Sequence, residues 1–131
     1  MPETPLQPGR VSLVGAGPGH PELITLRARR LIERADVVLY DRLASPALLA
    51  SMPAGKQERI HVGKGSGMQQ ADINRLLVAR ALQGQRVVRL KGGDPYVFGR
   101  GGEEAQACAE ASVDFEVVPG VSSAYGALAA A

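Results

Sequence analysis

Short apolar runs recur along the chain at nearly even spacing. Within each run, Val, Leu and Ile follow one another almost without interruption instead of alternating with polar residues. Such runs are typical of strands that are covered on both faces, as in a parallel sheet. The pattern predicts five strands, at residues 11–15, 36–40, 59–63, 86–90 and 114–118.

The segments between the strands carry apolar residues at helical spacing. Residues 23–35 place Leu and Ile on one side and arginines on the other, and residues 70–84 carry a second apolar stripe that Gly84 is well placed to end. Residues 101–111 open with two glutamates, which favour a helix N-terminus because carboxylates interact well with the helix dipole. Strands that alternate with helices predict an α/β fold, a five-stranded parallel sheet with helices on both faces.

The two ends of the chain differ from this alternating pattern. Residues 1–10 predict a flexible lead-in, and residues 11–131 predict an amino-terminal α/β domain. Residues 120–124 are typical of a turn and N-cap that open a sixth element, and the chain stops soon afterwards without a C-cap. This pattern indicates a truncated chain, so we expect that a carboxyl-terminal domain is absent from it.

Composition excludes several classes of protein. The 131 residues suffice for about one domain, and 45% apolar residues with a net charge of +2 exclude intrinsic disorder. The single Cys excludes a disulfide framework, and one Cys with two His predicts no metal site. The first ten residues lack the apolar centre of a signal peptide, and no apolar run reaches the roughly 18 residues of a membrane span. We therefore expect a soluble, cytoplasmic protein with no membrane partner.

The charge balance is slightly basic, with 15 Lys and Arg against 13 Asp and Glu. The densest basic stretch, Arg27, Arg29 and Arg30, falls in a predicted amphipathic helix and is interpreted as a solvated helix face. We expect no nucleic-acid partner, since nucleic acid requires basic residues clustered on one face. A small polyanionic ligand suits this balance better.

Candidate chemistry follows the predicted strands, because ligands of open parallel sheets bind at the carboxyl ends of the strands. All five strands are followed by glycine, charge or hydroxyl, at residues 15–19, 41–42, 64–65, 91–104 and 119–123. Each feature has a simpler structural explanation, such as a tight turn, an N-cap at Asp41 or a solvated Lys64. Their coincidence at one edge favours a binding site. His61, within a strand, and Cys108, within a helix, are expected to be structural.

One alternative is a dinucleotide-binding turn. Gly15 and Gly17 follow the first strand, and Asp41 ends the next strand, where a ribose-binding acid is expected. The pattern breaks at His20, where the third glycine is expected. Two nearby prolines also remove N–H groups that would receive the pyrophosphate. This pattern therefore disfavours a dinucleotide site without excluding it.

Five stretches of the sequence closely resemble the tetrapyrrole methylase family. They are VGAGPG at residues 14–19, ADVVLYDRL at 35–43, VGK at 62–64, RVVRLKGGDPYVFGRGGEE at 86–104, and residues 115–123. The fourth stretch is long and highly specific. The resemblance extends over nearly the whole chain from Val11, but it covers only the first of the family's two α/β domains.

The resemblance implies an enzyme, and the most similar branch of the family methylates uroporphyrinogen III. That branch transfers methyl groups from the co-substrate S-adenosylmethionine to carbons of uroporphyrinogen III, giving precorrin-2 on the way to sirohaem or cobalamin. It also implies a homodimer for the full-length protein, with the active site between two domains. This half is therefore expected to be inactive, or nearly so, alone.

The resemblance further implies roles for individual residues. Asp41 stands at the position of a proton acceptor, and Lys64 at that of a proton donor. Arg100 and Glu103 match positions at the tetrapyrrole pocket. The positions that bind the methyl donor are Pro18, Gly92, Gly93, Asp94, Val97, Ser122 and Ser123.

The chain departs from the family at His20, where Asp is usual; a His would orient a ligand only weakly and with a pH-dependent charge. Other functions stay open at this point. They are a methylase of a later corrinoid intermediate, of a diphthamide precursor or of ribosomal RNA, a nicotinamide-dependent oxidoreductase, and a non-catalytic interaction domain. The run GGDPYVFGRGGEE favours uroporphyrinogen III as the substrate.

Overall fold

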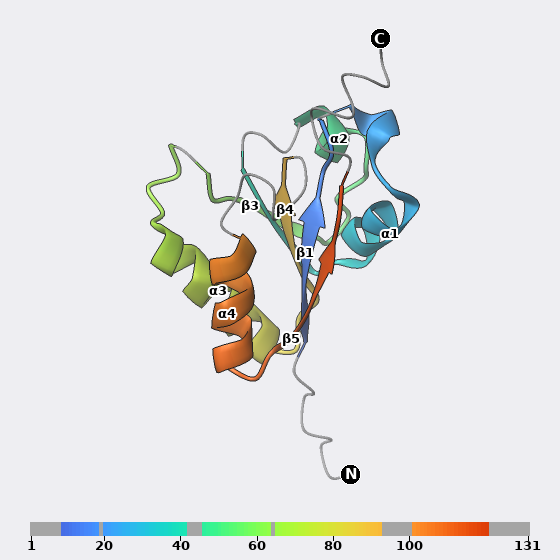
Figure 1. Cartoon of the computed structure of the whole chain (residues 1–131). Helices are drawn as coiled ribbons and strands as arrows, with labels where there is room; N and C mark the ends of the chain where they lie inside the picture. Colours follow the sequence, from blue (N-terminus) through green and yellow to red (C-terminus); the bar gives the residue numbers. More distant parts are fainter. Residues whose placement is uncertain (1–8, 19, 42–45, 64, 93–100, 121–131) are drawn as a thin grey trace.

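The computed structural model describes residues 9–18, 20–41, 46–63, 65–92 and 101–120. Five parallel strands form one sheet, as predicted, and their order is β3-β2-β4-β1-β5 (Figure 1). The strands are β1 (Arg10–Gly15), β2 (Val37–Tyr40), β3 (Glu58–His61), β4 (Val87–Lys91) and β5 (Asp114–Val118).

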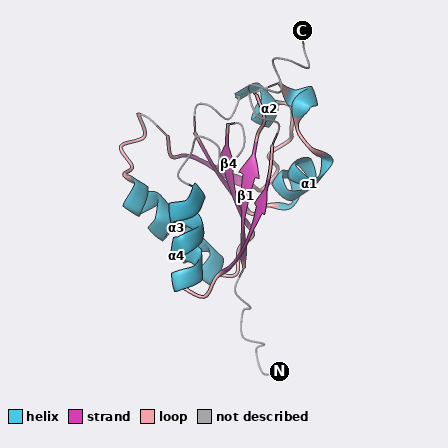
Figure 2. Ribbon diagram, in the orientation of Figure 1, coloured by secondary structure: helices cyan, strands magenta, loops and turns pink. Residues whose placement is uncertain are grey.

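Helices cover both faces of this sheet (Figure 2). One face carries α1 (Leu26–Arg34) and the short α2 (Pro46–Ala50), and a 3-10 turn, η1 (Pro21–Leu23), precedes α1. The opposite face carries α3 (Gln70–Leu82) and α4 (Gly101–Glu110), which pack side by side (Figure 1). The predicted α/β class with helices on both faces is therefore confirmed.

Two apolar cores lie on the two faces because side chains alternate along each strand. In β4, Val88 and Leu90 face α1 and α2, whereas Val87 faces α3 and α4. The neighbouring central strands follow the same alternation, so all three carry near-continuous apolar runs. This double burial explains why their sequences do not alternate.

Several boundaries differ from the predicted ones. The prediction placed β3 at residues 59–63, but its ladder ends at His61 because its partner β2 ends at Tyr40, the residue opposite. The apolar pattern did not predict α2, whose five residues are too few for a helical period. The prediction placed Leu26 and Leu82 in the apolar stripes of their helices, but both side chains are exposed, so this part of the prediction is wrong.

Gly84 ends α3, as predicted. Its backbone lies in the left-handed region at φ 84°, and its N–H donates to the Ala81 carbonyl at 2.9 Å. An L side chain in this region is strained, so Gly84→Ala is expected to lower the free energy of unfolding by about 1–2 kcal/mol.

Urea unfolding of the two proteins measures this difference. Gly102→Ala is the matched control, because an added Cβ at Gly102 meets no atom within 4 Å and the residue lies in α4. Its stability is expected to stay level or rise. A Gly84→Ala protein as stable as the unsubstituted chain would contradict the proposed role of the left-handed turn.

Candidate active site

The carboxyl ends of β1, β2 and β4 meet at one edge of the sheet. Gly15 lies opposite Lys91 in the ladder, and Tyr40 lies opposite Leu90. The N–H of Ala16 donates to the Lys91 carbonyl at 2.6 Å. This hydrogen bond joins the carboxyl ends of β1 and β4. The residues that leave these strands therefore share one edge.

Three residues expected at the site leave these strand ends. Asp41 directly follows β2, Gly92 directly follows β4, and Pro18 follows β1 in the turn of Gly17, whose φ of 72° is left-handed. Glu103 lies in the first turn of α4 and is exposed. The other expected site residues lie outside the described residues: Lys64, Gly93, Asp94, Val97, Arg100, Ser122 and Ser123.

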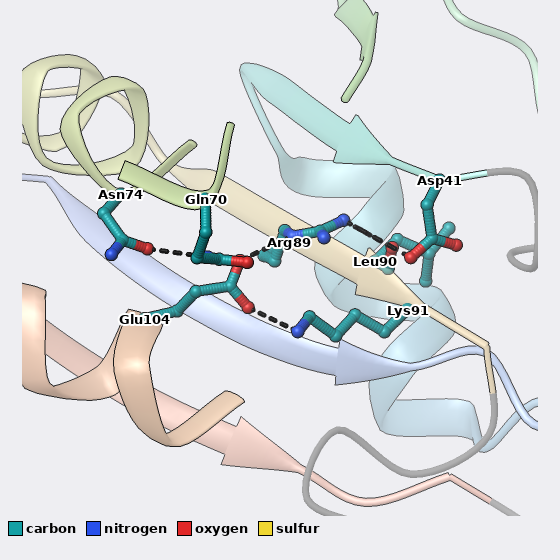
Figure 3. A network of polar contacts seen from close by, with 7 residues as sticks. All are labelled: Asp41, Gln70, Asn74, Arg89, Leu90, Lys91 and Glu104. Atoms are coloured by element: carbon teal, nitrogen blue, oxygen red, sulfur yellow. Dashed lines mark hydrogen bonds and ion pairs between the residues drawn. The ribbon is translucent and has the colours of Figure 1, made fainter. Parts of the chain in front are cut away.

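A network of buried charges lies beneath this edge, between the sheet and α4 (Figure 3). Glu104 is fully buried, and Arg89 and Lys91 are 4% and 6% exposed. Arg89 Nε donates to Glu104 Oε2 at 2.7 Å, and Lys91 Nζ lies 2.7 Å from Glu104 Oε1. Arg89 also extends toward Asp41, with Nη1 3.8 Å from Oδ2. The network thus links α4 to the end of β2.

The alternation of β4 explains how these charges come together. Arg89 and Lys91 are two residues apart, so both point to the face that carries α3 and α4. Glu104 reaches them from the first turn of α4. Two cations and two carboxylates share the network, and this balance is what makes the burial of the three central charges tolerable.

Sequence reasoning missed this network. Arg89 was placed inside the predicted strand, Lys91 and Glu104 were placed among the residues that follow it, and Glu104 was also assigned to the helix N-terminus, but the three were not expected to pair. A signal was nevertheless present: a strand covered on both faces buries its charged residues, and buried charges require partners. Two charges with a spacing of two residues in such a strand therefore predict opposite charges on one covering helix.

Asp41 is the member of the network that reaches the edge. Its side chain is 21% exposed, whereas the Arg89 side chain beside it is 5% exposed. One side of the carboxylate therefore faces a buried guanidinium, and part of the side chain is exposed at the edge. A carboxylate oriented in this way is suited to accept a proton.

His20 caps the turn η1 through Nδ1 of its side chain. This nitrogen therefore makes a local contact and does not point to a ligand. That nitrogen accepts the N–H of Glu22 at 3.1 Å, and His20 is exposed. An aspartate caps a backbone N–H in the same way. In this chain the His side chain supplies a local capping contact of the kind that an Asp side chain can also supply.

The described geometry also disfavours the dinucleotide alternative. In that alternative the glycine turn opens directly into a helix whose N-terminus receives the pyrophosphate. Here η1 intervenes, and α1 begins at Leu26 behind a cap by Thr25, whose Oγ1 accepts the N–H of Ala28 at 3.1 Å. The N-terminus of α1 therefore does not follow the glycine turn.

Cys108 is fully buried against the apolar core of the α3 and α4 face, as expected of a structural residue. Burial raises the pKa of its thiol to about 11, and the charge of Glu104 contributes in the same direction. At about pH 8 the native thiol is expected to react with iodoacetamide at least about 100-fold more slowly than in urea, because little thiolate forms.

Mass spectrometry of the alkylated protein, native and in urea, measures both rates. Raising the pH toward 11 should accelerate the native reaction as thiolate forms. Equal rates in the native and unfolded states at about pH 8 would contradict the buried environment.

The arginines of α1 lie on the solvent side, as predicted. Arg29 pairs with Glu33 one turn later, and Arg27 pairs with Glu116 of β5. Burial raises the pKa of Glu116, but hydrogen bonds from Arg27 and Ser12 outweigh it and hold the pKa below its usual value. Arg27 and Arg29 on the solvent face of α1 are therefore engaged in local ion pairs.

His61 lies in β3, as expected of a structural residue, with its ring 5.6 Å from that of Tyr40. No group of three His, Cys, Asp or Glu side chains that could hold a metal ion occurs in the described ranges. Within the same part of the chain, no helix has both the length and the apolar character needed to cross a membrane.

Comparisons with known proteins agree with this architecture. Residues 10–131 match the model of the Tetrapyrrole (Corrin/Porphyrin) Methylases. The chain belongs to the tetrapyrrole methylase family. This result confirms the family that the sequence motifs predicted.

Two curated proteins are similar to most of this chain. The "S-adenosyl-L-methionine-dependent uroporphyrinogen III methyltransferase" of Methanosarcina barkeri is 60% identical over 119 residues, which are 88% of this chain and 46% of that protein. The "Siroheme synthase" of Baumannia cicadellinicola is 57% identical over 92% of this chain and 27% of its own length.

A solved structure of the family has the same fold. The uroporphyrin-III C-methyl transferase of Thermus thermophilus, complexed with S-adenyl homocysteine, superposes with a TM-score of 0.78 at 56% identity, over 88% of this chain and 49% of that one. The chain thus spans about half the length of the two methyltransferases and about a quarter of the siroheme synthase.

Proposed function

We propose that this chain is the amino-terminal half of a two-domain methyltransferase that converts uroporphyrinogen III into precorrin-2 with S-adenosylmethionine as methyl donor. The observation that carries the proposal is the shared edge at which Asp41, Pro18 and Gly92 leave adjacent strands. The identity of 60% to a uroporphyrinogen III methyltransferase supports the choice of substrate. The half-length match supports the two-domain arrangement.

The turn residues at this edge fit a methyl donor. Gly92 has no side chain and follows β4, so a ligand can approach its backbone closely. Pro18 follows the neighbouring strand β1, directly after Gly17, whose backbone is left-handed. We assign donor binding to these two residues together with Gly93, Asp94, Val97, Ser122 and Ser123, so that the sulfonium is aligned with the attacking carbon.

Proton transfer accompanies methylation, because the pyrrole carbon attacks the methyl group and the ring must then lose a proton. Asp41 is the proposed acceptor, and Lys64 is the proposed donor. Arg100 would pair with a carboxylate of the tetrapyrrole. Glu103, exposed in the first turn of α4, would accept pyrrole N–H groups.

The proposal includes a cytoplasmic homodimer as the working form of the complete enzyme, on the basis of the family resemblance. In the proposed two-domain arrangement, the second domain would cover a tetrapyrrole bound at the carboxyl ends of the strands. Light scattering of the complete enzyme measures its mass and tests the dimer.

Methyl transfer from labelled S-adenosylmethionine to uroporphyrinogen III tests the function. The chain alone is expected to be nearly inactive, and fusion of the carboxyl-terminal half of the M. barkeri relative after Ala131 is expected to produce turnover. A panel with later corrinoid intermediates tests the substrate. Turnover by the chain alone that equals a two-domain enzyme would refute the half-enzyme arrangement. A folded fusion that binds the donor but prefers a later intermediate would refute uroporphyrinogen III.

A further inference from the structure

Glu104 occupies an unusual position for a carboxylate. It is fully buried, and both of its oxygens face cations of β4, at 2.7 Å to Arg89 Nε and 2.7 Å to Lys91 Nζ. The two contacts differ, because Oε2 accepts a hydrogen bond from the planar guanidinium of Arg89, whereas Oε1 faces the rotatable ammonium of Lys91. The directional contact of Glu104 is therefore the one with Arg89.

Arg89 transmits this contact to the edge of the sheet. Its guanidinium is planar and presents its donors in a rigid fork, so fixing Nε also fixes Nη1. Nη1 donates to the Leu90 carbonyl at 3.3 Å and lies 3.8 Å from Asp41 Oδ2. At 3.8 Å the guanidinium attracts the carboxylate without forming a direct hydrogen bond with it.

We propose that Glu104 is a positioning residue for the proton acceptor of the function proposed above. It holds Arg89 back from Asp41, so that Asp41 is oriented by a nearby positive charge and is still able to accept a proton. Without the negative charge of Glu104, Arg89 moves toward Asp41, the other carboxylate near it among the described residues, and forms a direct pair with it. This pair reorients the carboxylate that is proposed to accept the proton.

A purely structural role for Glu104 predicts different results. In that case the residue only anchors α4 to the sheet, and its loss lowers stability, donor binding and turnover together. A positioning role separates these quantities, since donor binding uses other residues of the edge. The separation of kcat from donor affinity therefore distinguishes the two roles.

The test uses Glu104→Gln in the two-domain enzyme, with Glu104→Asp as the conservative variant that keeps the charge. Glu110→Gln is the matched control, because Glu110 lies on the same helix and is exposed. For Glu104→Gln we expect kcat to fall by about 100-fold, as for a small misplacement of a reacting group, while the Kd for S-adenosylhomocysteine stays within about twofold. Glu104→Asp should retain more of kcat, and Glu110→Gln should retain all of it.

A crystal structure of each variant provides a readout that is independent of activity. The distance from Arg89 Nη1 to Asp41 Oδ2 is expected to shorten from 3.8 Å to about 3 Å in Glu104→Gln. An unchanged kcat or an unchanged distance would overturn the proposal. A loss of kcat and donor affinity in step with the melting temperature, in both variants alike, would also overturn it.

If Glu104→Gln does not fold, the test uses Glu104→Asp. The expected result is then a lowered kcat at an unchanged Kd for S-adenosylhomocysteine. A wild-type kcat would overturn the proposal. The unsubstituted enzyme separates this test from the proposed function. If it transfers no methyl group to uroporphyrinogen III, the function fails, and the distance between Arg89 and Asp41 still decides whether Glu104 positions the arginine.

Discussion

Asp41→Asn is expected to lower kcat for methyl transfer in the two-domain enzyme by about 10²- to 10⁴-fold, the usual contribution of a positioned general base. The side-chain amide has nearly the same size as the carboxylate, so the packing beside Arg89 is retained. The amide does not accept a proton at neutral pH. Donor binding should change little, because the residues proposed to hold the donor leave other strands than β2.

Two measurements check this expectation: single-turnover rates with labelled donor, and the Kd for S-adenosylhomocysteine. Asp114→Asn is the matched control, because Asp114 is an exposed carboxylate that begins β5, at the opposite end of the strands. It should keep the wild-type rate and affinity. Loss of donor affinity in Asp41→Asn with little change in the bound-state rate would make Asp41 a binding residue and not a base.

Arg89→Met is expected to lower the free energy of unfolding by about 3 kcal/mol, at the lower end of what breaking a buried ion pair costs. Among the described residues, the substitution leaves the fully buried Glu104 with Lys91 as its one cationic partner. It also removes the charge next to Asp41. Methionine fills a similar volume, so the loss reports the missing charge more than a cavity.

Urea unfolding of the chain measures the difference. Arg75→Met is the matched control, since Arg75 forms an exposed ion pair with Asp72 in α3, and its removal should change stability by less than about 0.5 kcal/mol. The double variant Arg89→Met/Glu104→Gln should recover part of the loss, because it removes the uncompensated carboxylate. An Arg89→Met protein as stable as the control would show that the buried network contributes little.

The strands could be predicted from sequence because burial on both faces leaves a local record. β5 has the predicted bounds, and β1 and β4 differ from them by one residue at one or both ends. The end of α3 was predictable for a similar reason, since the left-handed conformation at Gly84 favours glycine over any other residue.

The position of α2 depends on contacts that the local sequence does not record. Arg59 of β3 donates to the carbonyls of Leu49 and Met52 at the end of this helix, both at 2.8 Å. These partners are seven and ten residues away, and they meet only once β3 has joined the sheet. A five-residue helix without its own periodic signal therefore depends on a tertiary hydrogen bond.

The sequence by itself determined the α/β class, the edge that carries the candidate site, and the family, because strand periodicity and motif identity are local properties. It also singled out Asp41. Only the tertiary structure decided that Asp41 stands 3.8 Å from a buried arginine, and that this arginine donates a hydrogen bond to Glu104 of α4. The reason is that a buried charge is tolerated only with its partner, and this partner lies fifteen residues away on another element.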